Sequence, residues 1–499
     1  MLRNASEGVV RVCGRNPHYI EYKGKEILLI TSAEHYGAVI SANFDYVKYF
    51  DALHEYGLNY TRVYPGAIVE PEGMWLAEDT MTPGANLIAP WARSGEPGYI
   101  GGGNKFDLSE WDPAYFARLR GFVKEAGKRG IIVEICFYNC MNRAYIEYSP
   151  LHKDANIQGV GDYDHISFQT LDDETLVNEQ LRYMEKIIIE TNEFDNVIYE
   201  IIDEPTLTLT PSRKVSQWIE RHIEVAIALE ERLPKKHMIA QQLEIGVDFA
   251  GDDRVALIVT QYIGVSSRQI GGLPALNNCY CFNKPIELNE TAYVPSWYDR
   301  EHESISRLES WEFMVGGGAG FNQLNGYFVP SNPAGVNENN KKILAGFKNL
   351  RAFLESFQYI SMMRDGSTLK RVSVGASVNM ISEKGRQYAM YIHHSFPQPH
   401  GFGGTYYEPA YGEYEPTVTL ALPHGAYDVT FYEPLTMSIL GSSRIISGTP
   451  DAAGASDAQP ASDGAAGTPT ESKPAVAEVD IICPRYKLDI AIKIMATAS

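Results

Sequence analysis

The stretch VIYEIIDEP, at residues 197–205, joins a run of apolar and β-branched residues to two acidic residues and a proline. A continuous apolar run of this length is typical of a strand buried on both faces, as in a parallel sheet. Residues 174–191, just before it, place apolar side chains at helical spacing. The stretch therefore predicts a helix followed by a buried strand, which ends in Asp203 and Glu204.

The same alternation of short apolar runs and amphipathic stretches extends over most of the first 360 residues. Helical spacing also marks residues 43–56, 113–129 and 338–355. Eight runs have the length and composition of strands: 26–31, 60–64, 131–137, 197–202, 238–242, 257–262, 285–289 and 319–324. Eight such strands with intervening helices predict an α/β fold, a closed (β/α)8 TIM barrel.

After residue 365 the apolar period changes to two, which predicts a small all-β sandwich domain. Residues 447–478 are dense in small and polar residues and lack aromatics, which predicts a disordered low-complexity loop between two strands. We therefore divide the chain into an N-terminal strand segment at 1–22, a barrel at 23–362 and a C-terminal β-sandwich at 363–499. The first segment either docks on the sandwich or closes the floor of the barrel.

The net charge of −20 argues against nucleic acid or an anionic membrane as partner, because both bind basic surfaces. The N-terminus lacks the apolar stretch of a secretory signal, and the six cysteines are sparse. Both features favour a cytoplasmic protein, although a trimmed secreted chain would have the same sequence. Neither the cysteines nor the histidines have the spacing of metal ligands, so we expect no metal and no cofactor. The oligomeric state is open, a homo-oligomer included.

Two long connections follow predicted strands. Residues 65–111 are rich in glycine and proline, and residues 138–170 carry several tyrosines. In a (β/α)8 barrel the loops after the strands lie at the C-terminal face, where barrel enzymes carry out their chemistry. We expect both connections to wall a functional site, and surface decoration is the alternative.

Two glutamates close separate strands of the predicted barrel. Glu204 follows the run at 197–202, and Glu290 closes the run KPIELNE at 284–290. They are 86 positions apart (290 minus 204), close to the length of three β/α units of about 31 residues each. That spacing fits the fourth and seventh strands. Because cleavage of a glycosidic bond needs two carboxyl groups on opposite sides of the bond, this pair suits that reaction.

Three motifs resemble those of clan A glycoside hydrolases. YEIIDEP at 199–205 resembles their fourth-strand motif YExxNEP, KPIELNE at 284–290 resembles their seventh-strand motif, and GLNYTR at 57–62 resembles their second strand. The resemblance covers residues 23–360 and implies a family-five-like (β/α)8 barrel. The segment at 422–434 is similar to the β-sandwich that follows some barrels of this clan.

The resemblance implies that Glu204 is the acid/base and Glu290 the nucleophile of a retaining glycosidase, with a raised pKa for Glu204 and a low one for Glu290. One position departs from the pattern. The asparagine that normally precedes the acid/base and donates a hydrogen bond to the sugar 2-hydroxyl is Asp203 here. An ionised aspartate only accepts hydrogen bonds, so the identity of the sugar stays open. The change also allows Asp203 itself to be the acid, with Glu204 turned aside.

Other residues near strand ends are candidates for the substrate site. Arg62 would lie near Glu290 and keep it ionised, and the alternative is a structural ion pair with Glu200. Tyr262 ends the sixth strand and, as in the clan, would hydrogen bond to the nucleophile; the alternative is a packed tyrosine. Glu287 is the rival nucleophile, which strand alternation points to the face opposite Glu290.

Five further residues close or follow predicted strands. His35 and Tyr36 end the first strand and are predicted to contact substrate hydroxyls, with loop anchoring as the alternative. Tyr138, Asn139 and Trp297 follow later strands, and we predict that they line sugar subsites.

The sequence therefore predicts a retaining glycoside hydrolase that cleaves β-type glycosidic bonds in plant- or microbe-derived oligosaccharides. The absence of a visible signal and the two long loops favour exo over endo action on a short carbohydrate partner. Two alternatives stay open. One is a barrel that binds glycans without cleaving them, for which Asp203 is the one sequence feature. The other is an inverting or transglycosylating enzyme on the same scaffold.

Overall fold

The computed structural model describes residues 2–264, 270–291, 293–296, 303–399, 405–448 and 475–497. Trp297, a predicted subsite residue, and most of the low-complexity segment at 447–478 lie outside these ranges. The chain divides into two compact units, one of residues 1–353 and 397–408, the other of residues 354–396 and 409–499. Among the described residues, no helix combines the length and apolar character needed to cross a membrane.

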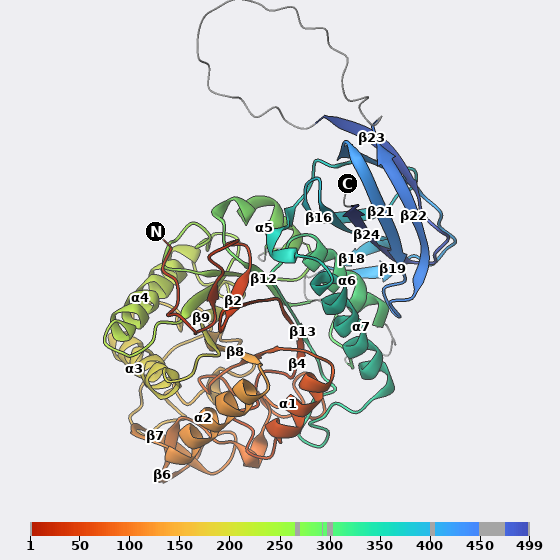
Figure 1. Ribbon diagram of the computed structural model, residues 1–499. Coiled ribbons are helices and arrows are strands. Elements are labelled where there is room, and N and C mark those ends of the chain that lie inside the picture. Colours follow the sequence, from red (N-terminus) through yellow and green to blue (C-terminus); the bar gives the residue numbers. More distant parts are fainter. Residues whose placement is uncertain are drawn as a thin grey trace, which may run out of the picture. The chain divides into compact units, whose positions relative to one another are not determined.

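The first unit contains an eight-stranded parallel sheet, which Figure 1 shows as the barrel at the centre of that unit. Neighbouring strands hydrogen bond in the order β4-β13-β12-β11-β10-β9-β8-β5. Their bounds are β4 (Leu29–Ala33), β5 (Tyr60–Val63), β8 (Ile132–Asn139), β9 (Val197–Asp203), β10 (Met238–Gln242), β11 (Leu257–Gln261), β12 (Ile286–Glu290) and β13 (Gly320–Leu324). The prediction of a TIM barrel is confirmed.

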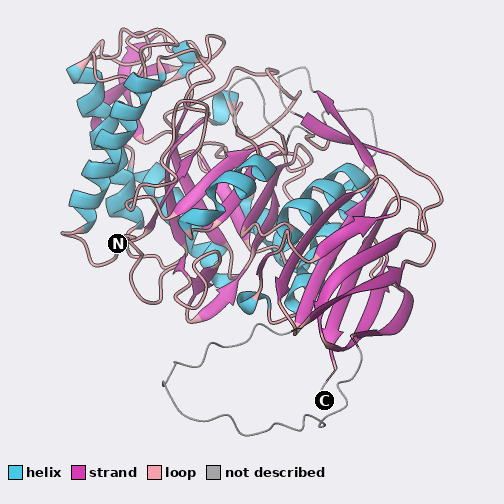
Figure 2. Cartoon of the chain, turned by 90° about the horizontal axis from the view of Figure 1, so that it is seen from above, coloured by secondary structure: helices cyan, strands magenta, loops and turns pink. Residues whose placement is uncertain are grey.

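Helices flank the barrel strands (Figure 2). Four of them match the predictions: α1 (Tyr46–Glu55), α2 (Pro113–Lys128), α3 (Glu174–Thr191) and α7 (Glu338–Glu355). Three were not predicted: α4 (Ser212–Glu230), α5 (Gly272–Cys279) and α6 (Glu303–Val315). Since α6 is buried along nearly its whole length, its sequence lacks the one-sided apolar stripe of a surface helix.

The barrel closes between β4 and β5 through Asn59, the residue before β5. Its Nδ2 donates a hydrogen bond to Leu28 O at 2.9 Å, and its Oδ1 accepts one from Ile30 N at 3.1 Å. Its backbone N–H donates to Ile30 O at 3.3 Å. These two strands share no continuous ladder in the described chain. The buried side chain of Asn59 therefore supplies two of the three hydrogen bonds that this residue makes across the seam.

The N-terminal segment covers the floor of the barrel. It forms the antiparallel strands β1 (Arg11–Val12), β2 (Ile20–Tyr22) and β3 (Lys25–Ile27). Its apolar side chains share one buried cluster with residues of the barrel strands, among them Tyr60 and Ile132. The sequence left open whether this segment docks on the sandwich or closes the floor of the barrel. Its described contacts are with the barrel. The opposite face, where the strands end, is left for the long loops, the first of which carries the hairpin β6 (Trp91–Pro97) and β7 (Asn104–Trp111).

The second unit is built from antiparallel strands around its own core. A six-stranded sheet has the order β14-β16-β17-β24-β21-β22, and a three-stranded sheet has the order β15-β20-β23. Apolar residues of both sheets, such as Met390 and Leu420, share one buried cluster, as expected for a β-sandwich. The strands are β14 (Met363–Arg364), β15 (Leu369–Val372), β16 (Ser377–Glu383), β17 (Gln387–His393), β20 (Thr417–Pro423), β21 (Gly425–Tyr432), β22 (Ile439–Ser447), β23 (Val476–Ile482) and β24 (Asp489–Ala496).

We predict that replacing Asn59 with leucine destabilises the barrel by roughly 2–4 kcal/mol, because Leu28 O and Ile30 N lose their buried partner. The measurement is the midpoint of thermal unfolding, followed by circular dichroism. Asn278→Leu, at an exposed position on α5, is the matched control and should leave the midpoint unchanged. Equal midpoints for Asn59→Leu and wild type would show that the seam does not depend on this side chain.

Candidate active site

The carboxyl ends of the barrel strands surround a cavity of about 400 Å³. Seven of the predicted site residues contribute to its wall: His35, Tyr36, Asn139, Asp203, Glu204, Tyr262 and Glu290. Its wall also contains Trp75 and Tyr145, from the two long connections expected to wall the site, and residues that were not predicted, among them Tyr64 and Glu70. The fold thus brings Glu204 from the end of β9 and Glu290 from the end of β12 to one cavity.

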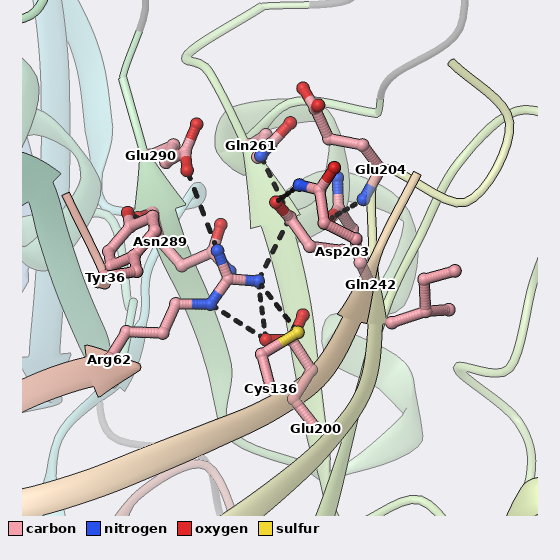
Figure 3. A network of polar contacts seen from close by, with 12 residues as sticks. Tyr36, Arg62, Cys136, Glu200, Asp203, Glu204, Gln242, Gln261, Asn289 and Glu290 are labelled. Carbon is pink, nitrogen blue, oxygen red and sulfur yellow. Dashed lines mark hydrogen bonds and ion pairs between the residues drawn. The ribbon is translucent and has the colours of Figure 1, made fainter. Parts of the chain in front are cut away.

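Arg62, on β5, lies fully buried beneath the carboxyl groups of this cavity. Its Nη2 lies 2.5 Å from Glu200 Oε2 and 3.0 Å from Asp203 Oδ1, and its Nη1 lies 3.6 Å from Glu290 Oε1. Figure 3 shows these contacts, from β9 and β12, converging on the guanidinium. Both roles considered for Arg62, near Glu290 and paired with Glu200, are therefore present in one network.

Asp203 is saturated with hydrogen-bond donors. Its Oδ2 accepts from the Tyr64 hydroxyl at 2.5 Å and from Asn139 Nδ2 at 2.7 Å. Its Oδ1 accepts from Gln261 Nε2 at 3.0 Å and faces Arg62 at the same distance. Figure 3 shows Asp203 turned toward Arg62 and Glu204 turned away from it. This arrangement suits a carboxylate that stays ionised rather than one that donates a proton.

Three pocket residues that follow barrel strands have left-handed backbone conformations: Tyr36 with φ 59°, Glu204 with φ 48° and Tyr262 with φ 62°. Such conformations cost on the order of 1–3 kcal/mol each for residues with a side chain. Hydrogen bonds from the backbone N–H groups hold all three, and that of Tyr36 donates to Glu34 O at 2.8 Å. Glu204 N–H donates to Gln242 Oε1 at 2.9 Å, and Tyr262 N–H donates to Glu290 O at 2.7 Å. The strained turns aim these side chains at the cavity.

The two glutamates have unusual acidities. Burial, with Asp203, Glu290 and Glu244 nearby, raises the pKa of Glu204 well above the ordinary range, as expected. Burial and the neighbouring Asp203 also raise the pKa of Glu290, to about 8, although Arg62 opposes the shift. The expectation of a low pKa for Glu290 was therefore wrong. The reason is that burial and Asp203 disfavour the charged form of Glu290, while Arg62 contacts three carboxyl groups and lies farthest from this one.

The hydroxyl of Tyr36, which follows β4, lies within hydrogen-bonding reach of the Glu290 carboxyl. The same hydroxyl lies 3.2 Å from Asn289 O, so the two oxygens share one donor. Tyr262 lies in the wall of the cavity and is tied to Glu290 through its backbone. We predicted that Tyr36 contacts substrate hydroxyls; in the structure its hydroxyl lies beside the Glu290 carboxyl.

Glu287 does not line the cavity. The reason is not the predicted alternation, which would have pointed it to the face opposite Glu290. Its Oε1 accepts a hydrogen bond from the Tyr60 hydroxyl at 2.7 Å. Tyr60 is on β5, which is not adjacent to β12, so this contact crosses the interior of the barrel. Arg62 and Glu290 make a contact of the same kind. A register shift between β11 and β12 ends at Glu290, so both glutamates face inward, with Glu287 at a deeper level.

Tyr138 does not line the cavity, and its prediction as a subsite residue was wrong. It is fully buried, its hydroxyl donates to Gln180 O on α3 at 2.6 Å, and its ring packs against Trp218 of α4. Tyr138 therefore faces the helix layer. Its neighbour Asn139 faces the cavity, where Nδ2 donates to Asp203.

His35 lies in the cavity wall between two acidic residues of the loop that follows β5. Its Nδ1 lies 3.3 Å from Asp79 Oδ2, and Glu70 lies close by. Burial opposes a positive charge on His35, but Glu70 and Asp79 raise the pKa of its imidazole to about 10. Burial raises the pKa of Glu70 to about 7. Among the described residues, this trio has the ligand atoms and spacing to hold a metal ion.

Comparison of the sequence with protein-family models and with curated proteins gives no match. Among solved structures, the chain is similar to one described as a glycoside hydrolase, with a TM-score of 0.57 and 10% identity, covering 99% of this chain and 98% of that one. A putative glycoside hydrolase from Bacteroides vulgatus has a TM-score of 0.59 and 12% identity, covering 99% and 83% of the two chains.

A glycoside hydrolase family 5 structure from the same organism has a TM-score of 0.57 and 11% identity, covering 99% and 94%. The chain has the fold of these proteins. At such low identity the likeness extends to the fold, which includes the barrel and the β-rich unit. The roles of individual residues in this chain depend on the geometry of its own cavity.

We predict that Asp203→Asn lowers the pKa of Glu290 below about 8, because it removes the negative neighbour and leaves more of the Arg62 charge to Glu290. The measurement is a ¹³C NMR titration of labelled glutamate carboxyls, with the Glu290 signal assigned by Glu290→Gln. Glu244→Gln is the control. Glu244 raises the pKa of Glu204 and is not among the groups that most shift the pKa of Glu290, so this change should leave the pKa of Glu290 where it is. A Glu290 pKa that is unchanged in folded Asp203→Asn, as judged by thermal unfolding, would contradict the assignment.

Proposed function

We propose that the protein is a retaining glycoside hydrolase in which Glu204 is the acid/base and Glu290 is the nucleophile. The observation that supports this most strongly is the meeting of two carboxyl groups, from the ends of β9 and β12, in one cavity. The raised pKa of Glu204 suits a group that must hold a proton at neutral pH. The saturated hydrogen bonding of Asp203 favours Glu204 over Asp203 as the acid.

In the proposed reaction the Glu290 carboxylate attacks the anomeric carbon while Glu204 donates its proton to the departing glycosidic oxygen. The sugar is then bound covalently to Glu290. Glu204, now ionised, takes a proton from a water molecule, whose oxygen attacks the same carbon and releases Glu290. Two displacements leave the anomeric configuration unchanged. Arg62 holds Glu290 in place and favours its ionised form.

The proposed substrate is a short oligosaccharide or glycoside with a β-type linkage. A cavity of about 400 Å³ with the aromatic side chains Trp75 and Tyr145 in its wall is suited to one or a few sugar rings. Those two residues come from the long loops after β5 and β8. The limited volume and the two loops support exo action over endo action on oligosaccharides of plant or microbial origin.

The main test uses Glu290→Gly on a panel of aryl β- and α-glycosides, both pyranosides and furanosides. We expect this change to lower turnover by more than about 1,000-fold, because the nucleophile is lost. Added azide should restore activity and give a glycosyl azide of inverted configuration. The exposed Glu147→Gln, in the loop after β8, is the control and should keep wild-type turnover.

Product stereochemistry by NMR distinguishes the alternatives. Retention in wild type together with azide rescue would support the proposal. Inversion would overturn the double displacement in favour of an inverting enzyme. Glycan binding by wild type without turnover on any member of the panel would favour a non-catalytic barrel.

A second prediction concerns pH. Because Glu290 must be ionised and its pKa is about 8, kcat/KM should rise with pH and reach half of its maximum near pH 8. At higher pH it should fall as Glu204 loses its proton. Initial rates over pH 4–10 at low substrate concentration measure this profile. Asp203→Asn should move the acidic limb to lower pH. An acidic limb near pH 4–5 in wild type, the range of an ordinary glutamate, would contradict the prediction.

A further inference from the structure

His35, Glu70 and Asp79 form a compact buried trio at the side of the cavity. His35 follows β4, whereas Glu70 and Asp79 belong to the loop between β5 and β6. One possible ligand atom from each residue lies within 4.8 Å of the other two. Their exposed fractions are 8%, 8% and 1%. Two carboxyl groups and one imidazole, largely removed from water, therefore face a common point.

The two carboxyl groups differ in their partners. Asp79 Oδ1 accepts a hydrogen bond from Thr82 N at 2.9 Å, which fixes the orientation of that carboxyl group. Glu70 Oε2 is buried, and no described residue donates a hydrogen bond to it. A buried carboxylate oxygen without a donor costs free energy unless something positive binds it. This oxygen is the second indication, besides the clustering, that the trio receives a ligand.

We propose that His35, Glu70 and Asp79 bind one divalent transition-metal ion at the wall of the cavity. His35 Nδ1 and Asp79 Oδ2 are hydrogen bonded to each other at 3.3 Å, which is close to the roughly 3.4 Å between two ligands of a tetrahedral zinc ion with bonds of about 2.1 Å. An imidazole ligand favours zinc and its neighbours over magnesium or calcium, which prefer oxygen. The ion would replace the proton that the two carboxyl groups favour on His35, and two carboxylates with the neutral imidazole would then balance its charge.

The position of the trio leaves room for a fourth ligand and for access from outside. His35 and Glu70 line the main cavity, so the open coordination position faces the space in which a sugar hydroxyl or water binds. Asp79 also lines a second cavity of about 300 Å³, whose wall contains Glu72 and Glu78. The wall of this second cavity is therefore acidic as well, which favours cations near the trio.

We expected no metal from the sequence, because its cysteines and histidines lack the spacing of metal ligands. The trio contains one histidine, and its acidic members are 35 and 44 positions farther along the chain. No local spacing motif connects them. A bound ion would connect the long loop after β5 to the residues that follow β4. It would therefore stiffen one wall of the cavity.

The test uses the full-length protein, stripped with a chelator and dialysed. Zinc is titrated by calorimetry, and bound zinc is counted by elemental analysis after gel filtration. We expect one zinc ion per chain. Cobalt(II), as a probe, should give the intense visible absorption of a tetrahedral or five-coordinate site with a nitrogen ligand. Neither readout depends on glycosidase activity, so this inference and the proposed function can fail separately.

Glu70→Gln and Asp79→Asn should each weaken zinc binding by at least about 10-fold and reduce the cobalt absorption. Glu72→Gln removes a charge from the same loop outside the trio and should bind zinc as wild type does. Thermal unfolding identifies a variant that has lost its fold. Absence of stoichiometric zinc in wild type would overturn the proposal whatever the variants do. Unchanged binding in folded Glu70→Gln and Asp79→Asn would overturn it as well.

Discussion

The buried guanidinium of Arg62 is the positive charge that connects the carboxyl groups at the functional end of the barrel. It contacts Glu200, Asp203 and Glu290, which come from β9 and β12, while Arg62 itself is on β5. Charges removed from water are stable only when they are paired and hydrogen bonded, so each carboxylate requires this arginine to remain where it is. Strands that do not neighbour one another are thereby fixed across the barrel interior. The same contact that stabilises the fold positions Glu290 in the cavity.

Beneath Arg62 the barrel interior holds two further acidic side chains, Glu134 and Glu287, and the charge of Arg62 acts on both of them. The Tyr60 hydroxyl hydrogen bonds to both Glu134 and Glu287. Burial raises the pKa of Glu287 to about 8 and that of Glu134 well above its ordinary range. Burial disfavours the charged form of both groups, and Arg62 opposes that shift. Its charge therefore acts on these two glutamates as well as on the three carboxyl groups that it contacts, of which Glu290 lies farthest from it.

The sequence predicted the barrel well because its strands are buried on both faces and read as continuous apolar runs. It missed α6, since a helix buried on nearly every side has no one-sided stripe. Within the site, the alternation of side chains along a strand explains why the prediction for Tyr138 was wrong. The same alternation led to a wrong reason for excluding Glu287. Tyr138 and Asn139 are adjacent in β8, so only one of them can face the cavity. The same rule fails for Glu287 and Glu290, because the register shifts between them. Tyr64 and Glu70 depend on contacts between distant parts of the chain, which local sequence patterns do not contain.

Asp203 stands where the family motif has asparagine, and the groups around it match an aspartate. Four groups direct donors at this side chain: Tyr64, Asn139, Gln261 and Arg62. An amide nitrogen at this position would place donors against donors, whereas a carboxylate accepts from all four. The network is therefore built for a negative charge, and that charge has two consequences. Asp203 has no hydrogen to offer a sugar hydroxyl, so a hydroxyl that meets it must be the donor. It also draws on the charge of Arg62, and the effect appears at Glu290 as a raised pKa. The feature that departs most from the expected motif thus adds, after burial, to the raised pKa of the proposed nucleophile.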